Sequence, residues 1–493
     1  MKRKLSTLFF CGLGFAIMFA GLASGQARIG KKLFDLKEIP QARTEKTSLA
    51  SVRESEISFN FQSLGETDTD FLNLTLFDSK NYSAKRSQTE IRGLDDFTWR
   101  GKITKNKFEG DVILTFNKGF VSGLIYTPEA VYEIVPKGEK QILVELNQEL
   151  FPECAGDVKG DESKTANTNN LVATDSGDRI DVLVLYTTPV KNSLGGDIQA
   201  QAFAQQAIDS TNTAYINSKI RQRVRLIAAQ ETLVAETGTL STELSAIRND
   251  ANIAALRNQV NADLVAMISN SSDNCGIGYL MGTNQVSGNA NNAFTVTSRT
   301  CAVGNLSFAH ELGHNMGSQH NPENGSGPTY PFGFGHYVNG SFRTVMSYGD
   351  PCTNGCTRRP YFSNPEVFFN GFPTGIDNAR DNARSINNTA DPIANYRYSG
   401  ANINLSNFNG GETLPRNVAR TLNWSSEGIS GNVRIEISRD ESTSWQTLIA
   451  DTPNDGSENI TVQGRPTRRA RIRVVSIDTP ANSDSSVRNI IIR

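Results

Sequence analysis

All four histidines of the chain lie close together, between His310 and His336. Three of them belong to the stretch AHELGHNMGSQH, in which apolar residues recur at helical spacing and a preceding polar residue, Asn305 or Ser307, could cap a helix. On such a helix two histidines four positions apart, His310 and His314, project from the same face. Their imidazoles can then bind the same metal ion. This stretch therefore predicts a helix that carries a metal site.

The residues next to this histidine pair complete a metal site of the catalytic type. Glu311 can stay near the ion without binding it and accept a proton from a metal-bound water. Gly317 tolerates a positive φ angle, so the chain can turn sharply and bring back His320 as a third ligand. Three histidines and one water form the open tetrahedral coordination of catalytic zinc, whereas structural zinc sites have four protein ligands. A surface pair or two core histidines would be the alternative for a shorter motif, but here five specified positions are filled.

A second element lies downstream in the segment RTVMSYG, where Met346 follows His320 by 26 residues. Taken alone, this residue would more often be an ordinary core methionine. Together the two elements resemble the zinc metalloproteases of the metzincin clan, in which an extended zinc signature precedes a methionine turn beneath the ligands. The positions that match this pattern are His310, Glu311, His314, Gly317, His320 and Met346.

Within the clan, residues 275–320 are similar to the bacterial reprolysin-like (adamalysin-like) enzymes, and the resemblance extends over about residues 178–398. It implies an α/β (α+β) catalytic domain with a mixed sheet, an active-site helix and a cleft for extended peptide. It also implies endopeptidase activity on protein or peptide substrates with one catalytic Zn²⁺ ion. In such enzymes a zinc-bound water attacks the scissile carbonyl, and Glu311 would act as general base and then as general acid. The sequence indicates neither a structural Ca²⁺ site nor an oligomeric state.

Two further residues lie near the signature without belonging to it. Tyr348 resembles the switch tyrosine of the astacin and serralysin branches, which can approach zinc or stabilise the oxyanion. Reprolysins generally lack this tyrosine, and buried packing is the alternative role. His336 is expected to line a pocket or to lie at the surface rather than to act as a fourth ligand.

Two other classes of protein could keep such a site: a zinc hydrolase of a non-peptide substrate, and an adhesion or binding protein that retains the metal. The intact Glu311 argues against the binding protein, because loss of that base is the simplest way to lose the chemistry. The net charge of −2 and the absence of any block of basic residues argue against a nucleic-acid partner.

Residues 1–26 have the layout of a cleaved secretory signal peptide, in which Lys2, Arg3 and Lys4 precede an apolar run and then small residues. The apolar run is short for a bilayer span, and no later segment is long and apolar enough. No stable membrane span is therefore expected. The protein is predicted to be secreted, to the extracellular medium, the cell surface or the periplasm.

Three larger regions follow the signal peptide. Residues 27–177 contain alternating strand-like runs and no histidine, which predicts a β-rich propeptide domain. Its end overlaps a polar segment without periodicity, residues 157–179, which reads as an exposed activation linker open to proteases. Strands and helices then alternate through residues 178–398, the predicted protease domain. Short strands separated by turn residues indicate an all-β sandwich accessory domain at residues 401–493.

Export outside the cytosol makes disulfide pairing the expectation for most cysteines. Once Cys11 is removed with the signal peptide, five cysteines remain, an odd number. Cys275 and Cys301 are expected to pair because the similar enzymes suggest it. Cys352 and Cys356 bracket the turn-forming tripeptide TNG and could close a small disulfide loop. Four cysteines nevertheless allow three pairings.

Cys154 is the cysteine left over, and it lies at the end of the histidine-free domain just before the linker. A thiolate is a better zinc ligand than water, so this propeptide cysteine could occupy the fourth position and displace the nucleophile. Related metzincins use such a cysteine switch, although ECAGD does not closely match their usual switch sequences. A free thiol, an intermolecular disulfide and a bond to a catalytic-domain cysteine are the alternatives. The switch predicts a latent zymogen.

Overall fold

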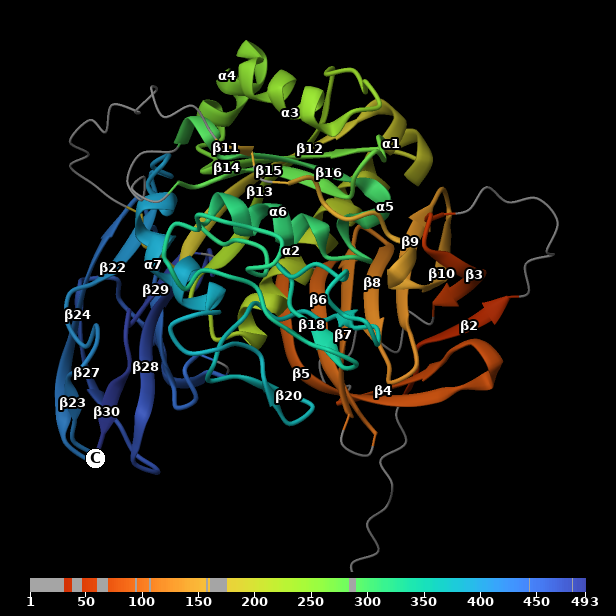
Figure 1. Ribbon diagram of the computed structural model, residues 1–493. Helices are drawn as coiled ribbons and strands as arrows, with labels where there is room; N and C mark the ends of the chain where they lie inside the picture. The colour runs from red at the N-terminus through yellow and green to blue at the C-terminus, as the bar shows by residue number, and fades with distance from the viewer. Residues whose placement is uncertain are drawn as a thin grey trace, which may run out of the picture.

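The structure is a computed structural model, and in chain order it shows an N-terminal sheet, a central α/β part and a C-terminal pair of sheets (Figure 1). The predicted signal peptide and most of the predicted linker lie outside the residues that the structure describes. No helix among the described residues is long and apolar enough to cross a membrane. The described residues are 31–37, 47–59, 70–93, 95–105, 108–156, 158–159, 175–282, 290–442, 444–480 and 482–493.

The N-terminal domain is one ten-stranded sheet in the order β1-β4-β5-β6-β7-β8-β9-β10-β3-β2. Its neighbouring strands are antiparallel except for the parallel pair β1 and β4. The strands are β1 (Lys31–Lys32), β2 (Phe34–Lys37), β3 (Ser51–Phe59), β4 (Phe71–Thr75), β5 (Asn81–Gly93), β6 (Asp96–Lys105), β7 (Phe108–Asn117), β8 (Phe120–Tyr126), β9 (Val131–Lys137) and β10 (Lys140–Leu146).

The central strands of this sheet are buried on both faces. Side chains alternate between the faces of a strand. In β7, Val112 and Leu114 point into the core of the N-terminal domain itself. Ile113, between them, points to the other face and joins a core with Phe203 of helix α2 (Asp197–Asn217). The N-terminal sheet therefore packs directly against the catalytic part of the chain.

A polar cluster fixes this packing in one position. Asp209 of α2 is buried and accepts hydrogen bonds from the hydroxyl groups of Thr98 (2.5 Å) and Thr115 (2.6 Å). The guanidinium groups of Arg92 and Arg100 lie 3.2 and 3.6 Å from the same carboxylate. A buried charge is tolerated only when it is paired and hydrogen-bonded, so this contact holds the two domains in a defined orientation.

The central part is built on a six-stranded mixed sheet in the order β11-β15-β16-β14-β12-β13. Most of its neighbours are parallel, whereas β15 runs antiparallel to β16. The mixed sheet and its active-site helix agree with the α/β catalytic fold that the resemblance implies. The strands are β11 (Val158–Lys159), β12 (Arg179–Thr187), β13 (Arg223–Thr232), β14 (Leu264–Ser269), β15 (Gly276–Leu280) and β16 (Phe294–Ser298).

Helices cover both faces of this sheet (Figure 1). Helices α3 and α4 lie on one face, where Leu244 packs with Leu183 and Met267 of the strands. Helices α2 and α6 lie on the other face. The helices other than α2 are α1 (Thr188–Leu194), α3 (Leu240–Asn249), α4 (Ala251–Gln259), α5 (Arg299–Ala302), α6 (Ser307–Asn315) and α7 (Asn382–Ala394).

Below α6 the chain forms only very short strands. β18 pairs antiparallel with β17 and parallel with β19, and β20 pairs with β21. The β18–β19 pairing joins two loops that enclose the Cys352–Cys356 segment, whereas the other two pairs are local in sequence. The strands are β17 (Tyr337–Val338), β18 (Phe342–Arg343), β19 (Thr357–Arg358), β20 (Phe368–Phe369) and β21 (Phe372–Pro373).

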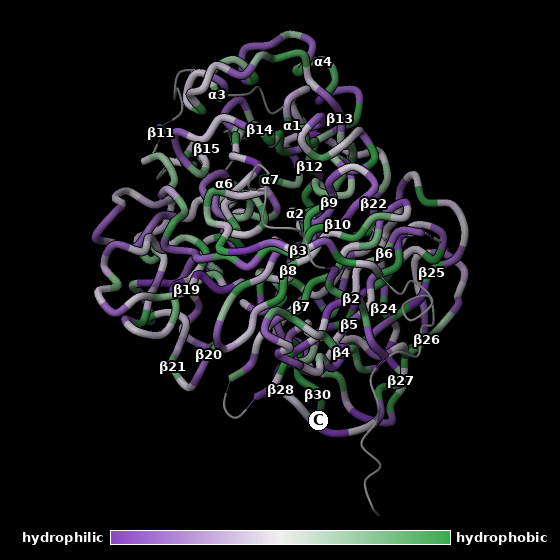
Figure 2. The backbone as a smooth tube through the Cα atoms, turned by 90° about the vertical axis from the view of Figure 1, so that its right-hand side faces the viewer, coloured by the Kyte–Doolittle hydropathy of each residue, from purple (hydrophilic) through white to green (hydrophobic). Residues whose placement is uncertain are grey.

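The C-terminal part consists of two sheets that share one core, in which Trp424 of one sheet packs with Ile435 and Ile472 of the other. Figure 2 shows hydrophobic segments in the interior near β7 and β8, and hydrophilic segments along much of the outside. The C-terminal strands are β22 (Asn402–Leu405), β23 (Thr413–Leu414), β24 (Ala419–Glu427), β25 (Val433–Ser438), β26 (Gln446–Thr452), β27 (Ser457–Thr461), β28 (Thr467–Ser476), β29 (Ser483–Ser485) and β30 (Ile490–Ile492).

Candidate active site

Helix α6 carries the first two predicted metal ligands and is buried along its whole length. It begins at Ser307, after Leu306, whose backbone is left-handed with a φ of 55°. The expectation that Asn305 or Ser307 caps the helix is therefore wrong. The Asn305 side-chain amide donates to the Ser307 hydroxyl (3.2 Å), and its backbone carbonyl accepts a bond from Arg358 (2.9 Å). Its side-chain oxygen, which a cap would use, has no hydrogen-bond partner among the described residues.

Gly317 turns the chain directly behind this helix. Its φ is +82°, a region that residues with a side chain rarely adopt. A Cβ atom at this position would also lie 2.6 Å from the hydroxyl oxygen of Thr329. The Gly317 amide donates to the His314 carbonyl (3.1 Å), so the turn follows the helix without a break. The chain then returns to place His320 beside the two helical histidines.

Replacing Gly317 with alanine should lower the free energy of unfolding by about 1–3 kcal/mol, because a strained φ and a steric overlap act together. It should also lower the bound zinc, since His320 loses its position. Gly327→Ala is the matched control, because Gly327 has a φ of +66° but open space around the added Cβ. Urea unfolding and metal analysis of both variants check this. Equal effects of the two substitutions would contradict the predicted role of the turn.

The three histidines converge through their Nε2 atoms. The His320 Nε2 atom lies 3.0 Å from that of His314 and 3.1 Å from that of His310. Each Nδ1 instead faces a backbone carbonyl, and donation to that carbonyl leaves the Nε2 lone pair free for a metal. This donor set fits Zn²⁺. The Nδ1 distances are 2.8 Å from His310 to Val345, 3.0 Å from His314 to Ser318 and 3.4 Å from His320 to Asn324.

Burial favours the neutral form of these rings. It lowers the pKa of His320 to about 2, with a further lowering from the neighbouring His314. Burial and the two other histidines lower the pKa of His310 well below its usual value. Neutral imidazole is the form that binds metal, so these rings need not lose a proton first.

Met346 lies directly beneath α6. Its sulfur would be 2.5 Å from a Cβ added at Gly313, so the glycine allows the helix and the methionine to approach closely. The preceding carbonyl, that of Val345, is the one that faces the His310 ring. The turn around Met346 therefore supports the floor of the site and fixes the orientation of one ligand.

Glu311 is fully buried between α6 and strand β15. Its carboxylate faces Gly276 and Gly278, where an added Cβ would lie 2.5 and 3.3 Å from the two oxygens. Burial raises the pKa of Glu311 to about 8, and the nearby Cys154 thiol partly offsets that rise. The strand thus leaves space for a carboxylate beside the histidines and shields it from bulk water.

Cys154 enters this site from the N-terminal domain and is the free cysteine of the described chain. Its sulfur belongs to a group of candidate ligand atoms with those of His310 and Glu311, all within 4.8 Å of one another. The side chain is buried, and its Sγ lies 3.8 Å from the Ser307 hydroxyl. Burial and the carboxylate of Glu311 raise the pKa of the thiol well above its usual value.

The segment around this cysteine lies along the edge of the catalytic sheet. The Cys275 amide donates to the Glu153 carbonyl (3.1 Å), and the Ala155 amide donates to the Gly276 carbonyl (2.8 Å). Two residues of the same segment form β11, which pairs parallel with β15. The N-terminal segment therefore occupies the sheet edge nearest the histidines as an added strand.

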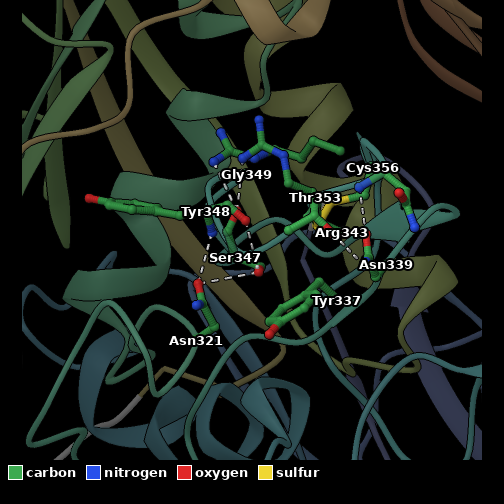
Figure 3. The surroundings of a disulfide bond; sticks show 12 residues. Asn321, Tyr337, Asn339, Arg343, Ser347, Tyr348, Gly349, Thr353 and Cys356 are labelled. Atoms are coloured by element: carbon green, nitrogen blue, oxygen red, sulfur yellow. Dashed lines mark hydrogen bonds between the residues drawn. A yellow bond between two sulfur atoms is a disulfide. The ribbon is translucent and has the colours of Figure 1, made fainter.

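Tyr348 also contacts this segment. Its hydroxyl donates to the Cys154 carbonyl (2.8 Å), and its ring lies over His320 with the centroids 4.2 Å apart. The Asn321 side chain accepts a bond from the Tyr348 amide (2.9 Å), as Figure 3 shows. The structure thus places the tyrosine at the site, with its hydroxyl bound to the N-terminal segment.

Sequence reasoning missed three charged residues at this site. Arg343 and Arg358 are buried, and their guanidinium nitrogens lie 3.8 and 3.9 Å from the Glu153 carboxylate. The Gly349 amide donates to the same carboxylate (2.9 Å). Arg343 lies beside Gly349 and Ser347, near the disulfide loop (Figure 3). An acidic residue directly before the odd cysteine, Cys154, is the one sequence signal that could have pointed to the cluster.

The two expected disulfides are confirmed. The Cys275–Cys301 bond joins the start of β15 to α5, just before the active-site helix. The Cys352–Cys356 bond closes the small loop after the methionine turn. His336 lies outside the histidine group and is buried beside Arg380, 3.5 Å from ring to guanidinium nitrogen. Burial lowers its pKa to about 4.

Comparison with known proteins gives consistent matches. Residues 176–363 match the family model Reprolysin_5, described as metallo-peptidase family M12. The peptidyl-Asp metalloendopeptidase of Stenotrophomonas maltophilia (strain R551-3) is 32% identical over 304 residues, which are 58% of this chain and 70% of that protein. The protein of the same name from strain K279a is 30% identical over 303 residues, with the same coverage. That of Xanthomonas campestris pv. campestris is 32% identical over 303 residues, 58% of this chain and 69% of that protein.

The family-model match, residues 176–363, covers the segment that holds the histidines, Glu311 and Met346, so similarity and geometry agree. The binding-protein and non-peptide alternatives are thereby set aside. The chain belongs to the bacterial reprolysin-like branch of metallopeptidase family M12 and is a zinc metalloendopeptidase of the metzincin type.

Proposed function

We propose that this chain is exported as a latent zymogen of a zinc endopeptidase that cleaves proteins next to aspartate. The carrying observation is the convergence of three histidine Nε2 atoms, with the buried Glu311 and the thiol of Cys154 grouped beside one of them, His310. The preference for aspartate is suggested by the relatives, which are named peptidyl-Asp metalloendopeptidases.

His310, His314 and His320 would hold a single Zn²⁺ through Nε2. When bound, this ion supplies Lewis acidity that polarises the scissile carbonyl and makes a nearby water a stronger nucleophile. The backbone carbonyls that accept from the Nδ1 atoms keep the rings oriented toward that ion.

Glu311 would take the proton from the attacking water and then deliver it to the leaving amine nitrogen. Its place beside β15 supports this role, because a peptide added to that sheet edge would pass close to its carboxylate. The ring of Tyr348 lies over that of His320. We assign its hydroxyl to stabilising the oxyanion once the Cys154 carbonyl has left.

Latency would rest on Cys154. Its sulfur stands next to His310 and Glu311, in the space that the attacking water needs. As a thiolate it would bind zinc in the fourth position and exclude that water. The N-terminal segment meanwhile blocks the sheet edge on which a substrate would lie.

The remaining parts of the chain would serve export, activation and attachment of an accessory domain. The signal peptide at residues 1–26 would direct export, and the N-terminal domain to residue 177 would act as the propeptide. A cut in the polar linker, residues 157–179, would then start activation. The two-sheet C-terminal region at 401–493 would serve as a β-sandwich accessory domain attached to the protease at 178–398.

Removal of the metal should abolish peptide cleavage. We expect the activated enzyme to lose its activity in 1,10-phenanthroline and to recover it on addition of about one equivalent of Zn²⁺, because the three grouped histidines would hold one ion. Cleavage of casein and metal analysis by mass spectrometry measure both effects. Full activity in a preparation shown to contain no metal would refute the proposed function.

A further inference from the structure

We propose that Arg343 and Arg358 form the pocket that binds the acidic side chain of the substrate beside the scissile bond. Glu153 of the N-terminal segment fills this pocket in the latent chain. The inference rests on the proposed cleavage next to aspartate, and it names the residues that would select that side chain.

The two arginines are held side by side in a buried place. They are direct partners in the register of β18 and β19, and their exposed fractions are 4% and 0%. Two adjacent positive charges in such a place repel each other strongly unless an anion lies between them. The arrangement therefore favours a negatively charged ligand.

The catalytic domain provides neutral partners for this pair. Both guanidinium groups donate to the Ser347 carbonyl, at 2.9 Å from Arg343 and 3.2 Å from Arg358. The Nε atoms of both are buried, and neither has a hydrogen-bond partner among the described residues. Within the described part of the chain, Glu153 is the one carboxylate within 4 Å of either group. The anion thus comes from the N-terminal segment alone.

The Glu153 side chain occupies the position that we assign to an acidic side chain of the substrate. Its Oε2 is 3.8 Å from Arg343 and 3.9 Å from Arg358, and its Oε1 accepts a bond from the Gly349 amide (2.9 Å). Gly349 also keeps the pocket open, because a Cβ there would lie 3.3 Å from Oε1 and 3.7 Å from the Arg343 guanidinium carbon. Direct charge-assisted bonds are about 2.7–2.9 Å, so a carboxylate that approaches more closely binds better than Glu153 does.

The position of the pocket matches that of a residue next to the cleaved bond. Glu153 directly precedes Cys154, whose sulfur lies with His310 and Glu311. Its backbone is hydrogen-bonded to the edge of the catalytic sheet, as an extended peptide would be. When the segment leaves, the arginine pair loses its counter-charge beside the catalytic centre and can accept another carboxylate.

A pair of peptides that differ only in aspartate or asparagine at one position tests this pocket. The enzyme activated from the full chain should cleave the aspartate peptide with a higher kcat/KM, and cleavage should occur next to that residue. Arg343→Gln and Arg358→Gln should each lower the Asp/Asn ratio of kcat/KM by about tenfold or more, since a charge-assisted bond is lost. The ratio is internal to each variant, so a reduced folded fraction leaves it unchanged.

Arg359→Gln is the matched control. Arg359 is the next residue and equally buried, but its guanidinium lies over the rings of Phe108 and Tyr126, away from Glu153. This variant should keep the wild-type ratio. A fall as large as that of the other two variants would overturn the assignment of the pocket.

A second experiment needs no enzyme variant. The synthetic peptide FPECAG, residues 151–156, should inhibit the wild-type activated enzyme, and the same peptide with Glu153→Gln should have a Ki about tenfold or more higher. Equal Ki values would refute the fit of Glu153 to the arginine pair.

The outcomes separate this inference from the proposed function. If the wild-type enzyme cleaves the aspartate and asparagine peptides equally well, the proposed preference for aspartate is wrong. The assignment of the pocket is then wrong as well. If the wild-type enzyme prefers aspartate and both arginine variants keep that preference, the assignment of the pocket alone is wrong.

Discussion

Replacing Glu311 with glutamine should reduce kcat by about 10²–10⁴-fold and leave the bound zinc unchanged. Glutamine has nearly the same shape but cannot accept the proton of the attacking water. Gly276 and Gly278 leave room for its carboxylate beside β15, and among the described residues Glu311 is the carboxylate grouped with a site histidine. Cleavage of a fluorogenic peptide and metal analysis of the same preparation measure the two quantities.

Glu366→Gln provides the control for this substitution. Its side chain is 74% exposed and lies far from the histidines in the sequence, so kcat should stay within about twofold of wild type. An unchanged kcat in Glu311→Gln would refute the general-base role. A loss of zinc in that variant would instead assign the glutamate to the metal site.

Replacing Cys154 with serine should make the unprocessed chain active. A hydroxyl is a much weaker zinc ligand than a thiolate, so water can reach the position that the sulfur blocks. We expect the intact variant to cleave a small peptide at least tenfold faster than the intact wild-type chain, and to degrade itself during expression. Peptide cleavage by the purified full-length chain, with its length verified by intact mass, measures the effect.

The double variant of Cys154→Ser with Glu311→Gln separates self-digestion from simple instability. It should accumulate as a full-length chain, because the exposed site cannot cleave. Degradation of the double variant at the rate of the single one would show that loss of the thiol destabilises the fold. A Cys154→Ser chain as inactive as wild type would contradict the switch.

The convergence of the three histidines was predictable because their geometry is local. Helical spacing alone places His310 and His314 on one face, and the positive φ available to Gly317 explains the return of His320. The disulfide loop at residues 352–356 was predictable for the same reason, since a short turn brings its ends together.

The arginine pocket was not predictable, because it arises from tertiary pairing. Arg343 and Arg358 meet only through two strands of two residues each, which carry no period that a sequence pattern can reveal. The cap of α6 was missed for a similar reason. Asn305 has the right residue type, but the left-handed Leu306 lies between it and the helix, and its side-chain amide instead points to the Cys275 sulfur and the Ser307 hydroxyl.

The sequence pattern also could not predict that the N-terminal strands are buried on both faces. Alternation predicted strands correctly, but a strand with apolar residues on both faces does not say what covers each face. Here one face covers the core of its own domain, and the other contacts helix α2.

Under the proposed activation, that shared packing would make activity depend on dilution. A cut in the linker would break the chain but leave Ile113 packed against Phe203, and Asp209 bonded to Thr98 and Thr115. The severed N-terminal domain would then act as a separate inhibitor protein, and its occupancy of the site would follow mass action rather than covalent attachment. The same cleaved enzyme should therefore be masked where it is concentrated, as in the exporting cell envelope, and free where it is dilute.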